Sequence, residues 1–515
     1  MTTPHRRLPY AVLILLVVLA QAPVAVRAAP GSCESIATLV LPNAKVTSVA
    51  EVAAGSFTPP TAQPGRGTPP AAARAYAALP VFCRASVTST PTSDSDIRIE
   101  VWLPKTGWNG KLQAVGNGGF AGTISYPALA AAVNGGYAAA STDTGHATPG
   151  SSVAMGHPEK LVDYAHRSLH ELAVSAKAII NAYYGSAQKV ALWNGCSTGG
   201  NQGLTLASKY PADFDAIIAG APPDPRARLM GVRVLLSHLV HRTAGSYIPA
   251  EKYPAIHKAA LAACDRMDGI EDGVIPNPPA CKFDPSVLSC KGADDPSCLT
   301  APQVETARII YAEVKHPTSG RALYPPLLQP GSELNWATLA GPEPFTISVD
   351  AFRHLAFKDP NWDPRRFRPG DIELMDEAAS VLNTVTPDLR PYFKRGGKLL
   401  MYHGWNDQQV PGTSSVTYFE RVLTASGRES AGRSIQLYMV PGMNHCQGGV
   451  GTDTFDKVAA MEDWIAKGVA PSHIVASRMA DGKVDRTRPL CPYPQIARYK
   501  GTGDTADASN FACAK

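Results

Sequence analysis

The pentapeptide Gly195-Cys196-Ser197-Thr198-Gly199 stands between a short apolar stretch and a stretch that favours a helix. It matches the pattern G-x-S-x-G, in which a sharp turn from strand to helix pushes a serine hydroxyl out of the sheet. Residues 189–193 before it predict a buried strand, and residues 203–207 after it predict the start of a helix. The sequence therefore predicts Ser197 as a nucleophile at the end of a strand in a mainly parallel α/β sheet.

Asp407 and His445 are the predicted partners of this serine. A serine is a weak nucleophile until a base removes its proton and a carboxylate orients that base. Both residues stand just past predicted strands and follow Ser197 in the order serine, acid, histidine. If Ser197 and His445 approach within hydrogen-bond distance, their neighbours Cys196 and Cys446 come close enough to form a disulfide. That bond would join the two catalytic loops.

Simpler roles remain open for these residues. Asp407 could cap its own loop, and His445 could be a surface histidine. Two other histidines compete for the part of the base: His146 precedes the serine, against the expected order, and His403 is expected inside a buried strand.

Donors for the oxyanion of a tetrahedral intermediate are expected from two places. One is the backbone N–H of Thr198, the residue after the serine. The other is the glycine-rich run 116–120, directly after a predicted strand, with Gly119 as the first choice and Gly118 as the second. A plain glycine-rich turn is the alternative for this run. A phosphate-binding loop is excluded because the run lacks a G-K-[ST] ending.

Residues 1–28 have the parts of a signal peptide: basic residues at 6 and 7, an apolar run over 10–26, and small residues before a cut after Ala28. A membrane anchor is the alternative, which Pro23 and the short run disfavour. No later stretch has the roughly 20 continuous apolar residues of a spanning helix, so no membrane association is expected after cleavage.

The cysteine content and the net charge limit the expected cellular compartment and the expected binding partners. Ten cysteines, an even number, are most simply five disulfides formed in an oxidising compartment. No asparagine begins an N-x-[ST] site, which favours a bacterial protein, secreted or periplasmic, over a fungal one. A net charge of +5 over 515 residues, without a long basic block, excludes nucleic acid as an expected partner.

Strand and helix signals alternate along most of the chain but not in its middle. Expected strands cover residues 97–103, 112–115, 138–142, 190–193, 216–220, 398–403, 435–440 and 474–478, and an expected helix covers 166–184. The proline-rich, irregular segment 224–388 predicts a domain inserted between core segments 29–223, which begins with an N-terminal arm, and 389–515. The alternative is one domain with long loops, which are uncommon at that length.

The insertion is expected to act as a lid that closes a substrate pocket over Ser197. Arg353 and Lys358 could pair there with a carboxylate on a substrate. Candidate aromatic walls, which could instead form the insertion's own core, are Trp336, Phe345, Phe352, Phe357 and Trp362.

An acidic, glycine-punctuated run at 264–274 is a candidate calcium loop. Asp265, Asp268 and Asp272 offer the hard oxygen ligands that calcium prefers, and the carbonyls of Ile270 and Val274 would complete the shell. The spacing is not that of an EF-hand. A solvated acidic turn is the alternative.

Taken together, these motifs resemble those of the tannase and feruloyl esterase family. The resemblance rests on the Cys196-Ser197 and His445-Cys446 pairs, on Asp407 followed by Val410-Pro411, on the run 143–146 and on the acidic loop, and it spans nearly the whole chain after residue 28. It implies an α/β-hydrolase core with a lid domain, esters of phenolic acids as substrates, a structural Ca²⁺ in the lid and no organic cofactor. It also implies the disulfides Cys33–Cys83, Cys196–Cys446, Cys264–Cys281, Cys290–Cys298 and Cys491–Cys513.

Several functions stay open at this point. The leading expectation is a secreted serine carboxylesterase for small aromatic esters, acting through an acyl-enzyme. A hydrolase of terephthalate monoesters belongs to the same family and is the nearest alternative. A peptidase on the same fold and a non-catalytic binding protein are further alternatives, because hydrolase folds are reused for other purposes.

Overall fold

The structure is a computed structural model that describes residues 1–2, 31–60 and 69–515, so the predicted signal peptide lies almost wholly outside the described residues. Its largest element is a nine-stranded sheet with the strand order β1-β2-β3-β5-β4-β6-β7-β10-β11. The first four strands in that order pair antiparallel, and β5 to β11 pair parallel. The strand bounds are β1 Ala44–Val52, β2 Phe82–Ser89, β3 Ile97–Pro104, β4 Lys111–Val115, β5 Ala138–Thr142, β6 Val190–Cys196, β7 Ala216–Gly220, β10 Lys398–Gly404 and β11 Ile435–Val440.

Both faces of the sheet are covered by helices, because side chains alternate between the faces along each strand. In β6, Ala191 and Trp193 join one apolar core while Leu192 joins the other. The first core is closed by α4 (Ser168–Tyr184), α5 (Thr198–Lys209) and α13 (Gly412–Ser426). The second is closed by α1 (Pro70–Ala77), α2 (Tyr126–Asn134) and α15 (Lys457–Lys467). This is the α/β-hydrolase core that the sequence predicts.

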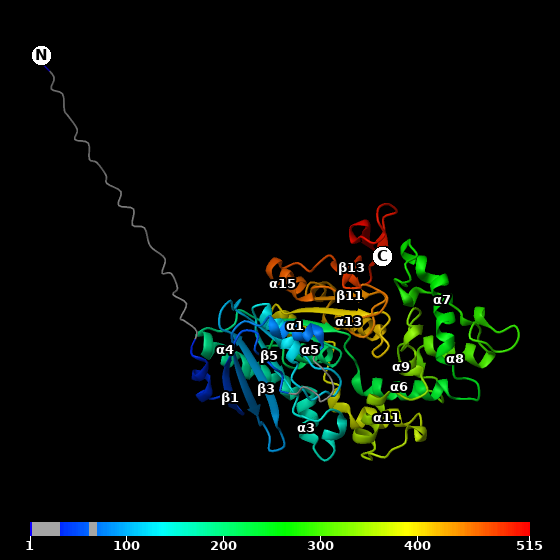
Figure 1. Cartoon of the computed structure of the whole chain (residues 1–515), viewed down its shortest axis with the longest axis horizontal. Helices are drawn as coiled ribbons and strands as arrows, with labels where there is room; N and C mark the ends of the chain where they lie inside the picture. Colours follow the sequence, from blue (N-terminus) through cyan, green and yellow to red (C-terminus); the bar gives the residue numbers. More distant parts are fainter. Residues whose placement is uncertain (3–30, 61–68) are drawn as a thin grey trace.

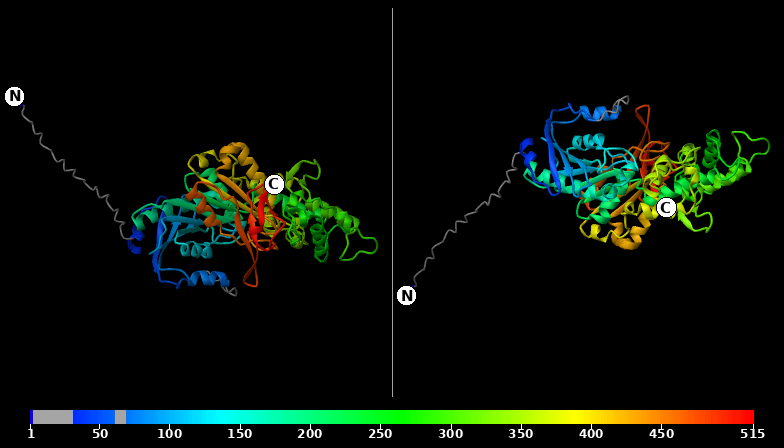
Figure 2. Two further views of the ribbon diagram at one scale, coloured as in Figure 1. Left: turned by 90° about the horizontal axis from the view of Figure 1, so that it is seen from above. Right: turned by 90° about the horizontal axis from the view of Figure 1, so that it is seen from below.

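Between β7 and β10, where every residue is described, the chain adds no strand to this sheet. It forms a helical unit instead, at one end of the molecule in all three views (Figures 1 and 2). The unit contains the small hairpin of β8 (Val314–Lys315) and β9 (Ala322–Tyr324), and its main helices are α6 (Arg226–Val240), α7 (Tyr253–Cys264), α8 (Ala301–Tyr311), α9 (Ala337–Ala340), α10 (Thr346–Ala351) and α11 (Asp371–Ala378). Its own apolar core includes Phe120, Tyr164 and Val410 from outside the segment.

The candidate wall residues of the insertion lie mainly in that core. Trp336, Phe352 and Trp362 are buried, and Phe345 and Phe357 pack against the same cluster while partly exposed. The simpler interpretation of these aromatics therefore holds for the first three. The bounds 224 and 388 and the covering role stay predictions.

Two regions differ from the sequence-based expectation. The N-terminal arm contributes β1 and β2 to the main sheet, and Cys33–Cys83 ties it down. The expected strand at 474–478 forms as β12 (Ile474–Ala480), but it pairs with β13 (Lys483–Leu490) in a separate hairpin. A second hairpin, β14 (Ile496–Tyr499) and β15 (Phe511–Ala514), ends the chain. In the described part of the chain, no helix is long and apolar enough to cross a membrane.

Candidate active site

Ser197 stands alone between the last residue of β6 and the first residue of α5. Its φ of 62° lies in a region that side chains rarely adopt, so the turn holds it under backbone strain. Close packing fixes the turn: a Cβ at position 195 would lie 2.4 Å from the carbonyl oxygen of Gly199, and one at position 200 would lie 2.1 Å from that of Gly220. Gly195 of the pattern and Gly200 just after it are therefore required by the close approach of strand, turn and helix. At Gly199, the second glycine of the pattern, a Cβ would lie 3.1 Å from the carbonyl oxygen of Asn117, which is a tight contact.

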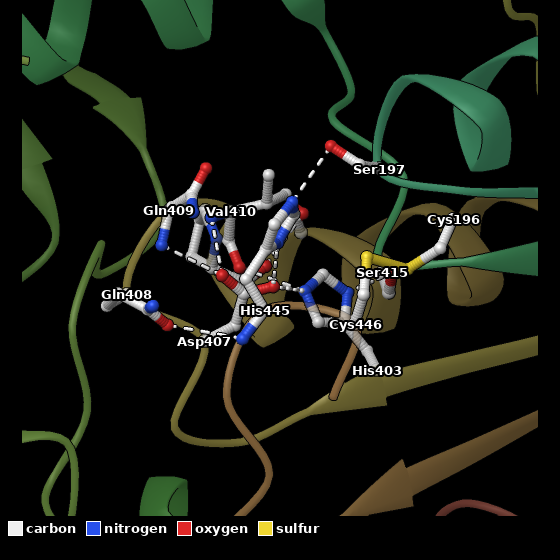
Figure 3. Close-up of polar contacts among 12 residues, drawn as sticks. Cys196, Ser197, His403, Asp407, Gln408, Gln409, Val410, Ser415, His445 and Cys446 are labelled. Atoms are coloured by element: carbon white, nitrogen blue, oxygen red, sulfur yellow. Dashed lines mark hydrogen bonds and ion pairs between the residues drawn. A yellow bond between two sulfur atoms is a disulfide. The ribbon is translucent and has the colours of Figure 1, made fainter. Parts of the chain in front are cut away.

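The structure brings the three predicted catalytic residues together (Figure 3). The hydroxyl Oγ of Ser197 lies 2.8 Å from Nε2 of His445, and Nδ1 of His445 lies 2.7 Å from Oδ2 of Asp407. His445 and Asp407 follow β11 and β10, at the same sheet edge as the turn after β6. The arrangement suits proton transfer from the serine hydroxyl to His445 while Asp407 orients the ring.

Four donors surround the carboxylate of Asp407, which is buried. Oδ1 accepts the backbone N–H groups of Gln409 and Val410, each at 2.8 Å, and Oδ2 faces both His445 and His403. Burial alone would raise the pKa of Asp407, but the charge of His445 and the hydrogen bonds of both histidines lower it below its usual range. Asp407 is therefore ionised at neutral pH and able to orient a cationic imidazole.

His403, one of the alternative bases, lies inside β10 and away from the serine. Its Nε2 is 3.1 Å from Asp407 Oδ2 and 2.9 Å from the carbonyl of Val410, and its Nδ1 is 2.7 Å from the hydroxyl of Ser415. Because both neighbours of Nε2 are acceptors, Nε2 carries the proton. No sequence pattern predicted this second histidine on Asp407, although the spacing of four residues between His403 and Asp407 could have suggested it.

The disulfide Cys196–Cys446 joins the serine turn to the histidine loop. The two Cα atoms are 6.0 Å apart, and 250 residues separate the cysteines in sequence. The other four bonds pair the cysteines that the resemblance implies, Cys33–Cys83, Cys264–Cys281, Cys290–Cys298 and Cys491–Cys513. Every cysteine of the chain is thus in a disulfide.

The glycine-rich loop after β4 lies against the serine turn, since the N–H of Gly199 donates to the carbonyl of Asn117 at 2.7 Å. All five carbonyls from 116 to 120 accept hydrogen bonds, from Ser125 Oγ, Gly199 N, Ala121 N, Tyr164 Oη and Gly150 N in order. Within the described residues, the N–H groups of Gly118 and Gly119 have no acceptor. The N–H of Thr198, in the first turn of α5, has no acceptor within its helix. These are the donor groups that the sequence analysis expected to face an oxyanion.

His146, the other alternative base, supports this loop rather than the serine. It is buried, its Nε2 lies 3.4 Å from the carbonyl of Phe120, and burial lowers its pKa. Beside the loop lies a cavity of about 230 Å³ to which the insertion contributes Ile347 and Asp350. The other residues that line it are Gly118, Phe120, Ala121, Pro149, Gly150 and Ser151.

The predicted calcium ligands lie together on one turn, but protein groups already contact them. Asp265 accepts the N–H groups of Asp272 and Gly273 at 3.2 and 2.9 Å. Asp272 pairs with Arg486 and Arg488, each at 2.7 Å. Burial, helped by the charge of Asp272, raises the pKa of Asp268 to about 6.

The carboxylate oxygens of these residues are the donor type that a hard cation prefers. A cation would also stabilise the buried charge at Asp268. The carboxylates are not gathered around one point. Among the His, Cys, Asp and Glu side chains of the described residues, the only three with ligand atoms within 4.8 Å of one another are Cys290, Asp294 and Cys298, and those two sulfurs form a disulfide. Both arginines contact Oδ2 of Asp272, so a cation at the acidic loop would share this carboxylate with them.

Helix α6 of the insertion contacts the loop that carries Asp407 directly and the glycine-rich loop through Tyr164. Nε of Arg233 donates to the carbonyl of Gln409 at 3.0 Å, next to Asp407, and burial lowers the pKa of Arg233 to about 10. Arg226, the first residue of the helix, donates to the hydroxyl of Tyr164, which in turn donates to the carbonyl of Gly119. No sequence pattern pointed to Tyr164, Arg226 or Arg233, since these contacts depend on tertiary packing.

Comparisons of sequence and structure relate the chain to known esterases. The chain is 36% identical to an uncharacterized esterase of Xanthomonas campestris pv. campestris, over 94% of this chain and 91% of the relative. It is 32% identical to a probable feruloyl esterase B-1 of Aspergillus flavus, over 84% and 86%. A crystal structure of feruloyl esterase B from Aspergillus oryzae matches with a TM-score of 0.85 and 29% identity, covering 94% of this chain and 99% of that chain.

The fold extends to a more distant protein. Tannin acyl hydrolase from Aspergillus niger matches with a TM-score of 0.77 at 23% identity, over 94% of each chain. The family model described as tannase and feruloyl esterase matches residues 83–514, most of the chain. The chain therefore belongs to the tannase and feruloyl esterase family.

Proposed function

We propose that this chain is a serine carboxylesterase that hydrolyses esters of aromatic, phenolic acids through an acyl-enzyme. The observation that carries the proposal is the connected set Ser197–His445–Asp407, with hydrogen-bond distances of 2.8 and 2.7 Å. Membership of the family supports ester hydrolysis.

In the proposed reaction, His445 removes the hydroxyl proton of Ser197 while Oγ of Ser197 attacks the ester carbonyl. The N–H groups of Thr198 and Gly119 stabilise the oxyanion that forms. His445, held by the ionised Asp407, then gives the proton to the departing alcohol, and Ser197 keeps the acyl group. Water attacks the acyl-enzyme by the same route and releases the acid.

The cavity beside the glycine-rich loop supports the proposal that the acyl group of the substrate is aromatic. Phe120 and Ile347 supply apolar walls, and the carboxylate of Asp350 is an acceptor suited to a phenolic hydroxyl. The fungal relatives are named feruloyl esterase B and probable feruloyl esterase B-1, and these names favour the same class of substrate. The insertion, which lines this cavity, would act as the lid.

We further propose an oxidising, extracytoplasmic location and a structural Ca²⁺. Five disulfides support the location, because such bonds persist in secreted and periplasmic proteins. Asp265, Asp268 and Asp272 with the carbonyls of Ile270 and Val274 would hold the ion, whose part would be to stiffen the insertion. No catalytic step passes through it.

The proposal is tested with Ser197→Ala beside the wild type. The variant should fold normally, lose labelling by a fluorophosphonate probe and lose kcat by a factor of about 10⁴–10⁶. A panel of methyl ferulate, methyl gallate, chlorogenate, a terephthalate monoester and a peptide anilide identifies the substrate class. More than about a tenth of the wild-type kcat in the variant, or preference for the anilide, would overturn the proposal.

A further inference from the structure

Tyr164 and Arg226 form a buried connection to the glycine-rich loop. Tyr164 lies in the turn Asp163–Arg167 before α4, and its hydroxyl donates to the carbonyl of Gly119 at 2.7 Å. Nη2 of Arg226 donates to the same hydroxyl. The two residues are only 1% and 2% exposed, so water does not compete for these bonds. The contact joins three segments that are distant in sequence.

Aromatic packing holds this connection in a fixed geometry. The rings of Phe120 and Tyr164 are stacked with centroids 4.4 Å apart, and the guanidinium of Arg226 lies 4.8 Å from the Tyr164 ring. It also lies 5.9 Å from the Phe120 ring. Phe120 follows Gly119 in the chain, so the ring stack and the Tyr164 hydroxyl together hold the two sides of the peptide group that contains the Gly119 carbonyl.

Arg226 lacks the usual partner of a buried guanidinium among the described residues. A buried guanidinium usually pairs with a carboxylate, because desolvating its charge is costly. Arg226 instead meets a neutral hydroxyl and two ring faces, and its Nη1 is buried without a hydrogen-bond partner among the described residues. A cation that donates to the phenol oxygen polarises the O–H and strengthens its bond to Gly119.

We propose that Tyr164 and Arg226 are positioning residues for the oxyanion donors, an inference that rests on the proposed ester hydrolysis. Gly119 has a φ of +51° and no side chain to restrain its backbone. The orientation of its peptide groups therefore depends on contacts with other residues. Tyr164 fixes its carbonyl and Arg226 fixes Tyr164. Together they hold the neighbouring N–H groups where the oxyanion forms, and Arg226 makes this hold depend on the insertion.

The main experiment compares Tyr164→Phe with Tyr184→Phe in the full-length protein. Tyr184 is a matched control, since it is buried and its hydroxyl also donates to a backbone carbonyl, that of Pro104, at 2.8 Å. Tyr164→Phe should lower kcat on methyl ferulate by about 10- to 100-fold with KM within about twofold, since losing one oxyanion donor outright costs about 10²–10³. Tyr184→Phe should leave both constants within twofold, although both variants lose a comparable hydrogen bond.

Inhibitor binding separates positioning from general loosening. An arylboronic acid that adds to the serine hydroxyl as a tetrahedral anion should bind Tyr164→Phe more weakly, by the same factor as kcat/KM. The product acid, which makes no oxyanion, should bind both proteins equally. Equal loss for both ligands would indicate a structural role and overturn the inference.

A double-mutant cycle tests the part of Arg226. Arg226→Met should lower kcat less than Tyr164→Phe, Arg226→Lys should recover part of that loss, and the double variant should resemble Tyr164→Phe because both residues act through one bond. If Arg226→Met does not fold, the comparison of Tyr164→Phe with Tyr184→Phe decides whether the inference stands.

A wild type without esterase turnover would overturn the proposed function and this inference with it. An active wild type beside an equally active Tyr164→Phe would overturn the inference alone.

Discussion

Nε2 of His403 lies 3.1 Å from Oδ2 of Asp407, the oxygen that also holds His445. The acid of the proposed triad is thus anchored by a second imidazole from inside the sheet. His403 is fully buried and cannot reach the serine, so its contribution is to hold Asp407 in place.

Replacing His403 should therefore weaken catalysis without removing it. His403→Leu should lower kcat by about 10- to 100-fold, because Asp407 loses one of its four donors and can shift by a fraction of an ångström. KM should change little. His403→Gln, which can still donate an N–H, should recover part of the loss. Steady-state kinetics on methyl ferulate with thermal melts test this, and a fully active, well-folded His403→Leu would contradict it.

The disulfide between the two catalytic loops should matter more for activity than for folding. Cys196→Ala/Cys446→Ala should fold but lose kcat by up to about 10²-fold, since a shift of about 1 Å between the loops is enough. For a loop of this length, chain entropy suggests a stability loss of about 5.5 kcal/mol, and measured losses are often smaller. The control is Cys491→Ala/Cys513→Ala, which should lower Tm and leave kcat near wild type. Equal kcat in the two variants would refute the idea.

Removing a divalent cation should act on stability first. If the acidic loop binds Ca²⁺, EDTA should lower the Tm of the wild type and excess Ca²⁺ should restore it. Asp265→Asn should show a lowered Tm that no longer responds to EDTA. Elemental analysis of the purified protein gives a reading independent of activity. An unchanged Tm together with no bound metal would count decisively against the site.

Asp143, after β5, should make stability depend on pH. Burial, against hydrogen bonds from the N–H groups of Gly145 and Arg98, raises its pKa to about 7, whereas the unfolded value is about 3.9. Between these values the folded chain binds more protons than the unfolded one, so the free energy of unfolding falls as pH rises from about 4 to about 7.

Asp143→Asn isolates this effect. Its amide oxygen can accept the same two N–H groups, which both point to Oδ1. The variant should match the wild type below about pH 4 and be more stable above about pH 7, where the wild type holds a buried charge. Urea unfolding at pH 4 and pH 8 measures the difference. The same pH dependence in both proteins would show that Asp143 does not cause it.

The features that could be predicted from sequence are those that local pattern and chain order encode. The turn at Ser197 has a fixed glycine spacing, and Asp407 and His445 each follow a strand in the required order. The sequence did not predict β1 because it is an edge strand with only Val46 buried, so its apolar alternation is weak. In β2 the burial alternates, but the buried positions include the small or polar residues Ala85 and Ser89, which weakens the apolar signal. The support of Gly119 by Tyr164 could not be foreseen, since 45 residues and no recurring spacing separate them.

The insertion was harder still to anticipate. Prolines and aromatic residues mask the helical periodicity of 224–388, and its helices are defined by a shared core rather than by strong local signals. Arg226 and Arg233 are seven residues apart and so lie on the same face of α6, about two turns from each other. Nothing in that spacing identifies the hydroxyl or the backbone carbonyl to which each arginine donates.

Because Cys196 and Cys446 are bonded, residues 196–446 form a covalently closed loop that contains the whole insertion. A protease that cuts once anywhere within the insertion would leave a single molecule of unchanged mass apart from one added water. Its two fragments would separate on a gel only after reduction. Both halves of the core would stay tethered at the serine turn, so a nicked enzyme could retain its triad while losing the continuity of the chain above it.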